Sequence, residues 1–415
     1  MQETPVVALQ GPRSVGKSTL LAEIARRLGA TVINLDDRLI RNAVASDPAA
    51  FVTGPSVVCV DEFQRVPDIL DAIKVELDDD LRWGRFLLTG STRFDALPRA
   101  AQSLTGRIQF VSILPFSQGE LGGVHEDYLA TALNEPAALA TGLGATTERL
   151  EYAERICAGG MPIAVATSPT ARARWFDTYI NLSLQRDAAE ISNIRRGAVL
   201  PRLLERLAGQ TGQILNIRSA GRDVGLETAT ADAYVKLLED LFLVQRLPAW
   251  GRTLRARAAA TPKIHVVDSG LAARLLRLTP ARLARLDPAT LVDFGHLLET
   301  FVVGELLKQA SWSDDVAGVG HWRTHDGQEV DLVIEGFDGR ITCFEIKASR
   351  QVDAHDARGL VALRNTLGDQ FNAGFVLGTG DVSYKLDDRI FVTPIDRLWQ
   401  PAAAPAGAVA KRRTS

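Results

Sequence analysis

A short glycine-rich run near the N-terminus limits the folds open to this chain more than any other feature. Residues 11–18 read GPRSVGKS, which fits the spacing G-x-x-x-x-G-K-[ST]. A buried-strand run, residues 6–9, precedes it, and a helical pattern with Leu21, Ala25 and Leu28 on one face follows. A loop between strand and helix can turn its backbone N–H groups toward a phosphate. We therefore predict a phosphate-binding loop, the alternative being a chance glycine-rich turn.

The residues of this loop have separate expected roles. The glycines let the backbone curl around the phosphates of ATP, and the Lys17 ammonium reaches the β- and γ-phosphates. The Ser18 hydroxyl is an expected ligand of Mg²⁺. Nucleotide contacts are predicted for Gly11, Pro12, Arg13, Ser14, Val15, Gly16, Lys17, Ser18 and Thr19.

A pair of acidic residues after the next buried strand completes the predicted nucleotide chemistry. Residues 56–60 form a buried-strand run that ends in Asp61 and Glu62. Asp61 can hold Mg²⁺ through water, and Glu62 can activate the attacking water. A glutamate at this position favours hydrolysis of ATP over transfer of its phosphate. The alternative is that the two acids only cap a helix.

A third strand and two arginines supply further candidates. Residues 85–89 read as a strand, and Ser91 or Thr92 at its carboxyl end is expected beside the γ-phosphate, unless it only caps the next helix. Arg93 and Arg107 are candidates for a finger that neutralises transition-state charge, in the same chain or in a neighbour. Either arginine is equally compatible with a plain surface position.

Alternation of strands and helices sets the fold class of residues 1–126. Residues 31–35 and 108–113 bring the strands to five, separated by helical segments, which predicts an α/β three-layer sandwich of the P-loop NTPase type. Asp36 and Asp37 follow the second strand and are expected to cap the next helix, the alternative being that they support the metal ligands of the nucleotide site.

Composition places the chain among ordinary globular proteins. Its 415 residues are 46% hydrophobic and 23% charged, which allows two or three domains. No apolar run is long enough to span a bilayer and the N-terminus does not resemble a signal peptide, so we expect a cytoplasmic protein without a membrane partner. Cys59, Cys157 and Cys343 are expected to be reduced core thiols.

The charge distribution is uneven. Residues 1–171 carry a formal charge of −6, residues 172–263 of +6, and the remainder of −3. A basic middle is expected where a module faces phosphate, and its alternative is a solvated, arginine-rich helical surface.

The basic middle contains a predicted winged helix. Residues 127–199 read as a helical connector that begins with a linker or loose helix at 127–150. Residues 200–268 read as helix, turn and helix, the last helix running from 228 to 240, followed by two apolar strands at 241–247 and 263–267 that would form the wing. Its helix from Thr228 would face the major groove of double-stranded DNA, although Asp232, Glu239 and Asp240 weaken that prediction. The alternative is a winged helix used only for packing or protein contact. Predicted DNA contacts are Arg218, Arg222, Arg252, Arg255 and Arg257.

Residues 269–399 are similar to the core of restriction-type nucleases. A helix at 291–308 carries Glu299, and a following hairpin carries Asp331, Glu345 and Lys347, the last two on one face because side chains alternate along a strand. The carboxylates could bind a second Mg²⁺ or a Mn²⁺, with Lys347 orienting water. The alternatives are a fold retained for DNA binding without cleavage, and a structural Glu345–Lys347 pair. Residues 400–415 are expected to be a disordered tail.

As an ordered set, these motifs resemble a family of prokaryotic AAA-type P-loop ATPases with a C-terminal DUF4143 domain. The resemblance covers almost the whole chain and implies an ASCE-type P-loop domain, a winged-helix-like middle and a PD-(D/E)xK nuclease-like α/β C-terminal domain. The matching segments are residues 11–19, 58–64, 88–91, 104–107, 159–162, 186–187, 237–244 and 322–347.

Three functions fit the sequence. The leading hypothesis is a Mg²⁺-dependent ATPase that acts on or regulates DNA or a DNA-bound complex, with Lys17, Glu62, Ser91 and Arg107 as its catalytic residues. The second is a metal-dependent DNase coupled to an ATPase switch. The third is a scaffold with little turnover, in which bound nucleotide controls contact with a protein partner or a second copy of the chain.

Overall fold

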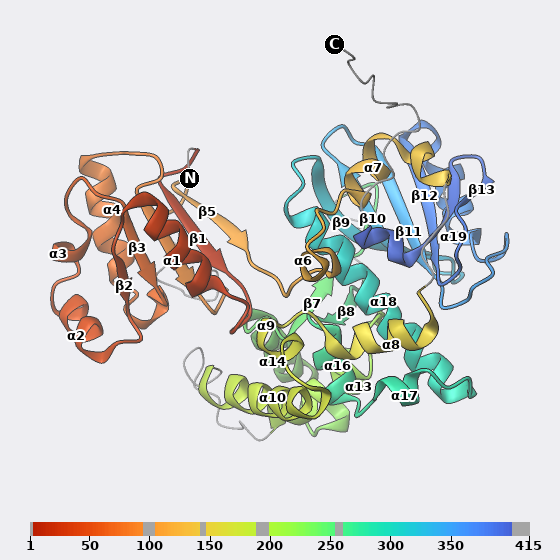
Figure 1. The fold of residues 1–415 in the computed structure, drawn as a ribbon, viewed down its shortest axis with the longest axis horizontal. Coiled ribbons are helices and arrows are strands. Elements are labelled where there is room, and N and C mark those ends of the chain that lie inside the picture. Colours follow the sequence, from red (N-terminus) through yellow and green to blue (C-terminus); the bar gives the residue numbers. More distant parts are fainter. Residues whose placement is uncertain (1–2, 94–103, 142–146, 188–198, 254–259, 401–415) are drawn as a thin grey trace, which may run out of the picture. The chain divides into compact units, whose positions relative to one another are not determined.

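The computed structural model describes residues 3–93, 104–141, 147–187, 199–253 and 260–400. They divide into two units (Figure 1). The first comprises residues 1–115, 161–206 and 217–245, and the second comprises residues 116–160, 207–216 and 246–415. Within the described ranges, no helix is both long and apolar enough to cross a membrane.

A parallel sheet of five strands forms the core of the first unit and confirms the predicted α/β fold. The strands lie in the order β2-β3-β4-β1-β5, so β4 separates β1 from β3. All pairings between neighbouring strands are parallel. The strands are β1 (Val6–Gln10), β2 (Val32–Asn34), β3 (Val58–Asp61), β4 (Phe86–Gly90) and β5 (Ile108–Ser112).

Alternating side chains give this sheet two apolar faces. On one face, Val7 and Leu9 of β1 pack with Leu21 and Ala25 of α1 (Lys17–Leu28). On the other, Val6 and Ala8 join a core with buried residues of three helices. These are α2 (Arg38–Ser46), α3 (Ala49–Val52) and α4 (Ile69–Asp79). Helices on both faces make the three layers.

Helices make up the rest of the first unit. The largest are α10 (Pro169–Leu182), α12 (Leu200–Ala208), α13 (Ile217–Asp223) and α14 (Thr228–Asp240), of which α12 extends past the unit boundary. A short α9 (Pro162–Val165) precedes α10. Helix α14 has the predicted bounds. The strand expected from residue 241 begins only at 244, as β7 (Val244–Leu247), because Phe242 turns the chain with a φ of 55°.

The second unit is built on a mixed sheet of six strands in the order β13-β14-β12-β11-β10-β9. Strands β9, β10 and β11 form an antiparallel meander that contains the predicted hairpin, and β11, β12 and β14 are parallel. The strands are β9 (Val316–Arg323), β10 (Glu329–Gly336), β11 (Ile341–Ile346), β12 (Phe371–Gly378), β13 (Tyr384–Asp387) and β14 (Ile390–Pro394).

Helices cover this sheet on both faces. Helix α19 (Arg358–Leu367) packs Leu360 and Leu363 against Cys343 of β11. The long helix α18 (Pro288–Ser311) contacts β10 and β11. A group of shorter helices, α8 (Arg149–Ala158), α16 (Ser269–Leu275) and α17 (Pro280–Leu283), packs together beside α18. The strands β6 (Gln213–Ile214) and β8 (Lys263–Val266) pair antiparallel, and β7 completes a small sheet in the order β6-β8-β7.

The segment predicted at residues 127–150 as a linker or loose helix begins with a helix, the second of those alternatives. Helix α7 (Tyr128–Asn134) buries Tyr128, Leu129 and Leu133. The Tyr128 hydroxyl lies 2.6 Å from Thr393 Oγ1, and Gln309 Oε1 accepts a hydrogen bond of 2.8 Å from the Leu129 N–H.

Candidate functional site

The phosphate-binding loop has the backbone that its glycines predict. Gly11 and Gly16 have φ of 152° and 100°, and Ser14 has a φ of 62°. A Cβ on Gly11 would lie 2.1 Å from the carbonyl oxygen of Ile113, so no side chain fits there. Helix α1 starts directly after Gly16, which has no side chain to cap it. The start of the helix therefore presents N–H groups to the loop, where a phosphate can accept hydrogen bonds from them.

Lys17 is held inside this loop. Its side chain is only 5% exposed, and its ammonium donates to the carbonyl oxygens of Gly11, at 2.9 Å, and Pro12, at 2.6 Å. A positive charge is therefore already positioned where an anionic ligand of the loop would lie.

Ser18 and Asp61 meet across the gap between α1 and β3. The Ser18 hydroxyl donates to Asp61 Oδ1 at 3.0 Å. Thr89 of β4 donates a second hydrogen bond to the same oxygen. A hydroxyl and a carboxylate are the hard oxygen ligands that Mg²⁺ prefers, so this pair fits the ion.

Glu62 is fixed by its backbone and by its carboxylate. It has a left-handed backbone with a φ of 57°, and its N–H donates to Thr89 Oγ1 at 3.1 Å. Its Oε2 accepts hydrogen bonds from Ser91, at 3.1 Å, and from the side-chain amide of Gln64. A left-handed glutamate costs about 1–3 kcal/mol and persists only where its surroundings hold it. The predicted residues Lys17, Ser18, Asp61, Glu62 and Ser91 thus gather at the carboxyl ends of β1, β4 and β3.

Two residues of this site were not predicted. Thr89 bridges Asp61 and Glu62, and Gln64 links Glu62 to Ser91, with 3.1 Å between Gln64 Nε2 and Ser91 Oγ. Thr89 is buried and lies at the end of an apolar strand. A hydroxyl residue at that position in the sequence was the signal that could have identified it.

The two candidate arginine fingers point elsewhere. Arg107 immediately precedes β5, whose Ile108 pairs with Val6, so Arg107 lies at the amino edge of the sheet and its guanidinium pairs with Asp78 at 2.6 Å. Five strand residues, about 17 Å, separate that edge from the phosphate-binding loop. This corrects the expectation that Arg107 acts on the nucleotide of its own chain. Arg93 instead donates to the Glu239 carbonyl at 3.1 Å and lies over the Phe242 ring.

The predicted DNA contacts Arg218 and Arg222 line one pocket of about 850 Å³. The start of α14 provides its other wall, with Thr228, Thr230 and Tyr234. The Arg222 side chain is 77% exposed. Arg252 does not line this pocket, and Arg255 and Arg257 lie outside the described residues.

The C-terminal carboxylates converge, but around a lysine that was assigned to the wing. Lys263 of β8 donates to Glu299 Oε1 and to Asp331 Oδ1, both at 2.7 Å. Asp331 lies at a β-bulge of β10, and its Oδ2 accepts from the Ile346 N–H at 2.9 Å. Lys347 pairs with Glu345 at 2.7 Å, which confirms that these two side chains share a face.

Burial dominates the protonation of this cluster. It raises the pKa of Glu299 to about 8, with help from the charge of Asp331. Burial also works to raise the pKa of Asp331, but the charge and hydrogen bond of Lys263 outweigh it and lower that pKa. Burial and the charge of Asp331 raise the pKa of Glu345 well above its ordinary value.

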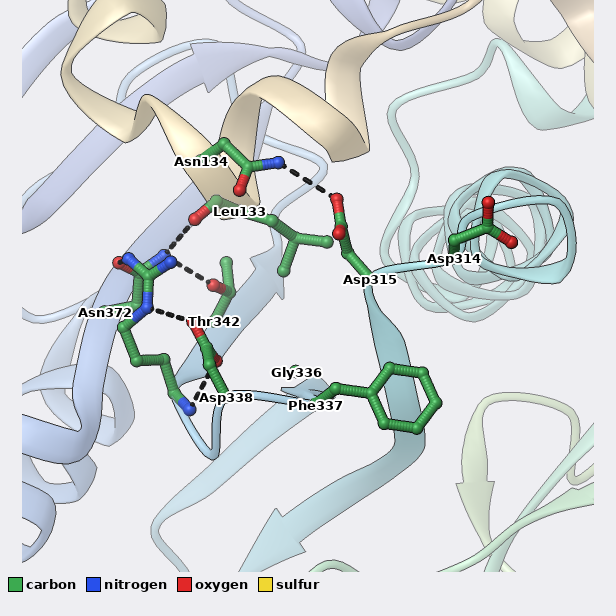
Figure 2. Close-up of a pocket in the computed structure, with 10 residues that line it drawn as sticks. Leu133, Asn134, Asp314, Asp315, Gly336, Phe337, Asp338, Thr342 and Asn372 are labelled. Carbon is green, nitrogen blue, oxygen red and sulfur yellow. Dashed lines mark hydrogen bonds and ion pairs between the residues drawn. The ribbon is translucent and has the colours of Figure 1, made fainter.

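A separate pocket of about 200 Å³ in the second unit contains none of the predicted residues (Figure 2). Its polar groups bond to one another. Asn134 donates to Asp315 at 3.1 Å, and Arg340 donates to Asn372 at 3.0 Å. Asn372 in turn donates to the Leu133 carbonyl at 2.9 Å. These bonds attach α7 to the sheet, so we assign this pocket a structural role.

Three family models match successive parts of the chain. An AAA domain matches residues 3–122, the domain of unknown function DUF8612 matches residues 149–282, and the domain of unknown function DUF4143 matches residues 294–398.

Two mycobacterial proteins and one solved structure are also similar. The chain is 26% identical over 401 residues to the uncharacterized proteins Mb2031c of Mycobacterium bovis and Rv2008c of Mycobacterium tuberculosis, which covers 96% of this chain and 82% of each relative. The Thermotoga maritima RuvB Holliday junction branch migration motor is 18% identical, covering 59% of this chain and 82% of that chain, with a TM-score of 0.26. With the family matches at its two ends, the chain joins an N-terminal AAA domain to a C-terminal DUF4143 domain.

Proposed function

We propose that this chain is a Mg²⁺-dependent ATPase. The observation that carries the proposal is the convergence of Lys17, the Ser18–Asp61 pair and Glu62 at one edge of the parallel sheet. Phosphates of ATP would take the place of the carbonyl oxygens that now accept from Lys17. This exchange neutralises phosphate charge with a cation that is already in position.

Glu62 is the proposed general base. It accepts the proton of the water that attacks the γ-phosphorus, while the bond between that phosphorus and the bridging oxygen breaks and ADP leaves. Ser18 and Asp61 would hold Mg²⁺, which neutralises the developing charge on the phosphates. Ser91 and Gln64 orient the Glu62 carboxylate, and Thr89 fixes the backbone that carries it.

The test is phosphate release from Mg²⁺-ATP by purified protein. We expect Lys17→Ala to abolish turnover, and Lys74→Ala, which removes an exposed lysine of the same domain, to leave it unchanged. Normal hydrolysis by Lys17→Ala would refute the site. The scaffold hypothesis would be favoured instead if the unmutated protein binds ATP without hydrolysing it and if nucleotide changes the molecular mass of its assembly in solution.

A second proposal, that the ATPase acts on duplex DNA, is supported by the arginine pocket and by α14. The pocket at the start of α14 presents Arg218 and Arg222, whereas Arg93 holds the last turn of the same helix. Arg93 lies two residues after Ser91 of the nucleotide site and contacts the end of α14, whereas the pocket lies at the start of that helix. Helix α14, about 20 Å long, therefore links the nucleotide site to the pocket. The helices and strands at residues 200–266 also follow the order that we expect for a winged helix.

Hydrolysis measured with and without duplex DNA, at two salt concentrations, tests this second proposal. We expect salt-sensitive stimulation, and we expect Arg222→Ala to lower the slope of log affinity against log salt by about one. Arg174→Ala, an exposed arginine of α10, is the matched control. A rate of hydrolysis that is unchanged by DNA would favour the hypothesis that the ATPase acts on a protein partner.

A further inference from the structure

A lysine occupies the centre of the C-terminal carboxylate cluster. Lys263 is 2% exposed, and its ammonium lies 2.7 Å from one carboxylate oxygen of Glu299 and 2.7 Å from one of Asp331. Divalent cations bridge carboxylates at similar positions, with oxygen distances of about 2.0–2.6 Å for Mg²⁺ and Ca²⁺. The ammonium therefore fills the place that such a cation would take.

The backbone that carries this lysine is fixed by strand pairing. Lys263 begins β8, where it pairs with Ile214 of β6, and the following residue pairs with Gln213. Both carboxylates also come from fixed elements, since Glu299 is near the middle of α18 and Asp331 is at the bulge of β10. The cluster of Lys263, Glu299 and Asp331 thus joins three elements of the second unit, and its geometry is set by all three.

Solvent reaches the other side of the cluster. Glu345 and Lys347 line a pocket of about 310 Å³, together with Arg323, His355 and Arg358. Glu345 Oε2 is buried and has no hydrogen-bond partner among the described residues. Ions in solution therefore have a route to the cluster, and what opposes their binding is the charge of Lys263 and its occupation of both ligand oxygens.

We propose that Lys263 is a built-in cation that replaces the divalent metal of this nuclease-like cluster, so that the C-terminal domain binds neither Mg²⁺ nor Mn²⁺ there. Without a metal, the domain has no means to activate water for phosphodiester cleavage by the route first predicted for Glu299, Asp331, Glu345 and Lys347. The nuclease-like domain is on this view a binding or scaffolding domain, in which Lys263 and its two carboxyl partners form a structural cluster.

Mn²⁺ binding to the full, nucleotide-free chain tests this proposal directly. Free Mn²⁺ is measured by its electron paramagnetic resonance signal for the unmutated protein, Asp331→Asn, Lys263→Met and the double variant. Methionine keeps the length of the lysine stem but removes its charge. We expect the Asp331→Asn variant to bind Mn²⁺ to the same extent as the unmutated protein. We expect Lys263→Met to gain a Mn²⁺ site that weakens at least about tenfold when Asp331→Asn is added.

Two outcomes would overturn the proposal. One is Mn²⁺ binding by the unmutated protein that Asp331→Asn or Glu345→Gln abolishes. The other is a folded Lys263→Met protein that gains no Asp331-dependent site. Weak binding at the phosphate-binding loop is common to all four proteins and cancels in the comparison. If Lys263→Met fails to fold, the comparison of the unmutated protein with Asp331→Asn still shows whether the unmutated protein has a Mn²⁺ site that depends on Asp331.

Discussion

Replacement of Thr89 by valine tests how the two acids of the nucleotide site are held. The Thr89 hydroxyl accepts from the Glu62 N–H at 3.1 Å and donates to Asp61 Oδ1. Valine has nearly the same shape, so Thr89→Val removes both hydrogen bonds without opening a cavity. Thr89→Ser, which keeps the hydroxyl, is the matched control.

The expected loss of stability follows from burial. Both Thr89 and Glu62 are buried, so Thr89→Val leaves a buried N–H without its acceptor, at a cost of about 1–3 kcal/mol. The same N–H belongs to a residue with left-handed backbone, so its loss removes one of the contacts that hold that conformation. For a domain of this size, each 1 kcal/mol lowers the Tm by about 2–4 °C.

The effect on turnover should exceed the effect on stability. When the Glu62 backbone relaxes, its carboxylate shifts, and a displacement of about 1 Å costs about 100-fold in rate. Calorimetry and phosphate release measure the two effects, and nucleotide binding serves as a control because the loop itself is untouched. Turnover of Thr89→Val equal to that of the unmutated protein would refute the role of Thr89, whatever its Tm.

Three further predictions concern charged residues. Arg93→Ala should keep basal hydrolysis but weaken its stimulation by DNA, because the side-chain contacts of Arg93 with Glu239 and Phe242 are lost while its backbone N–H still donates to the Asp240 carbonyl; undiminished stimulation would contradict a role for these side-chain contacts. Arg107→Ala should leave turnover unchanged at protein concentrations where the chain is monomeric, and a loss there would restore Arg107 as a residue acting within its own chain. Because burial raises the pKa of Glu299 from its ordinary value of 4.5 to about 8, the folded state holds a proton that the unfolded state has released. Stability should therefore fall as pH rises between about 5 and 8, by up to about 1.4 kcal/mol per pH unit, and Glu299→Gln should flatten that dependence in urea unfolding.

The nucleotide site was predictable because its chemistry needs residues that are close together in the sequence. Gly11, Gly16 and Lys17 act through one loop, and Asp61 and Glu62 are adjacent at the end of one strand. The parallel sheet of the first unit was predictable for the same reason, since its central strands β1, β3 and β4 are largely apolar, buried runs.

Residues that act over long sequence distances escaped prediction. Lys263 is 36 residues from Glu299 and 68 from Asp331, so only the folded chain reveals them as partners. Lys263 was predicted only as the first residue of an apolar wing strand, with no role of its own. The position of Arg107 was available from the sequence, because a residue that precedes a parallel strand lies at the edge opposite the ligand.

The most direct test of the ATPase proposal is turnover by Glu62→Gln, which keeps the size and hydrogen bonding of the side chain but cannot accept a proton. We predict that this variant binds Mg²⁺-ATP as tightly as the unmutated protein and hydrolyses it about 10²–10⁴-fold more slowly, the usual contribution of a general base. Unchanged hydrolysis by Glu62→Gln would contradict the proposed mechanism.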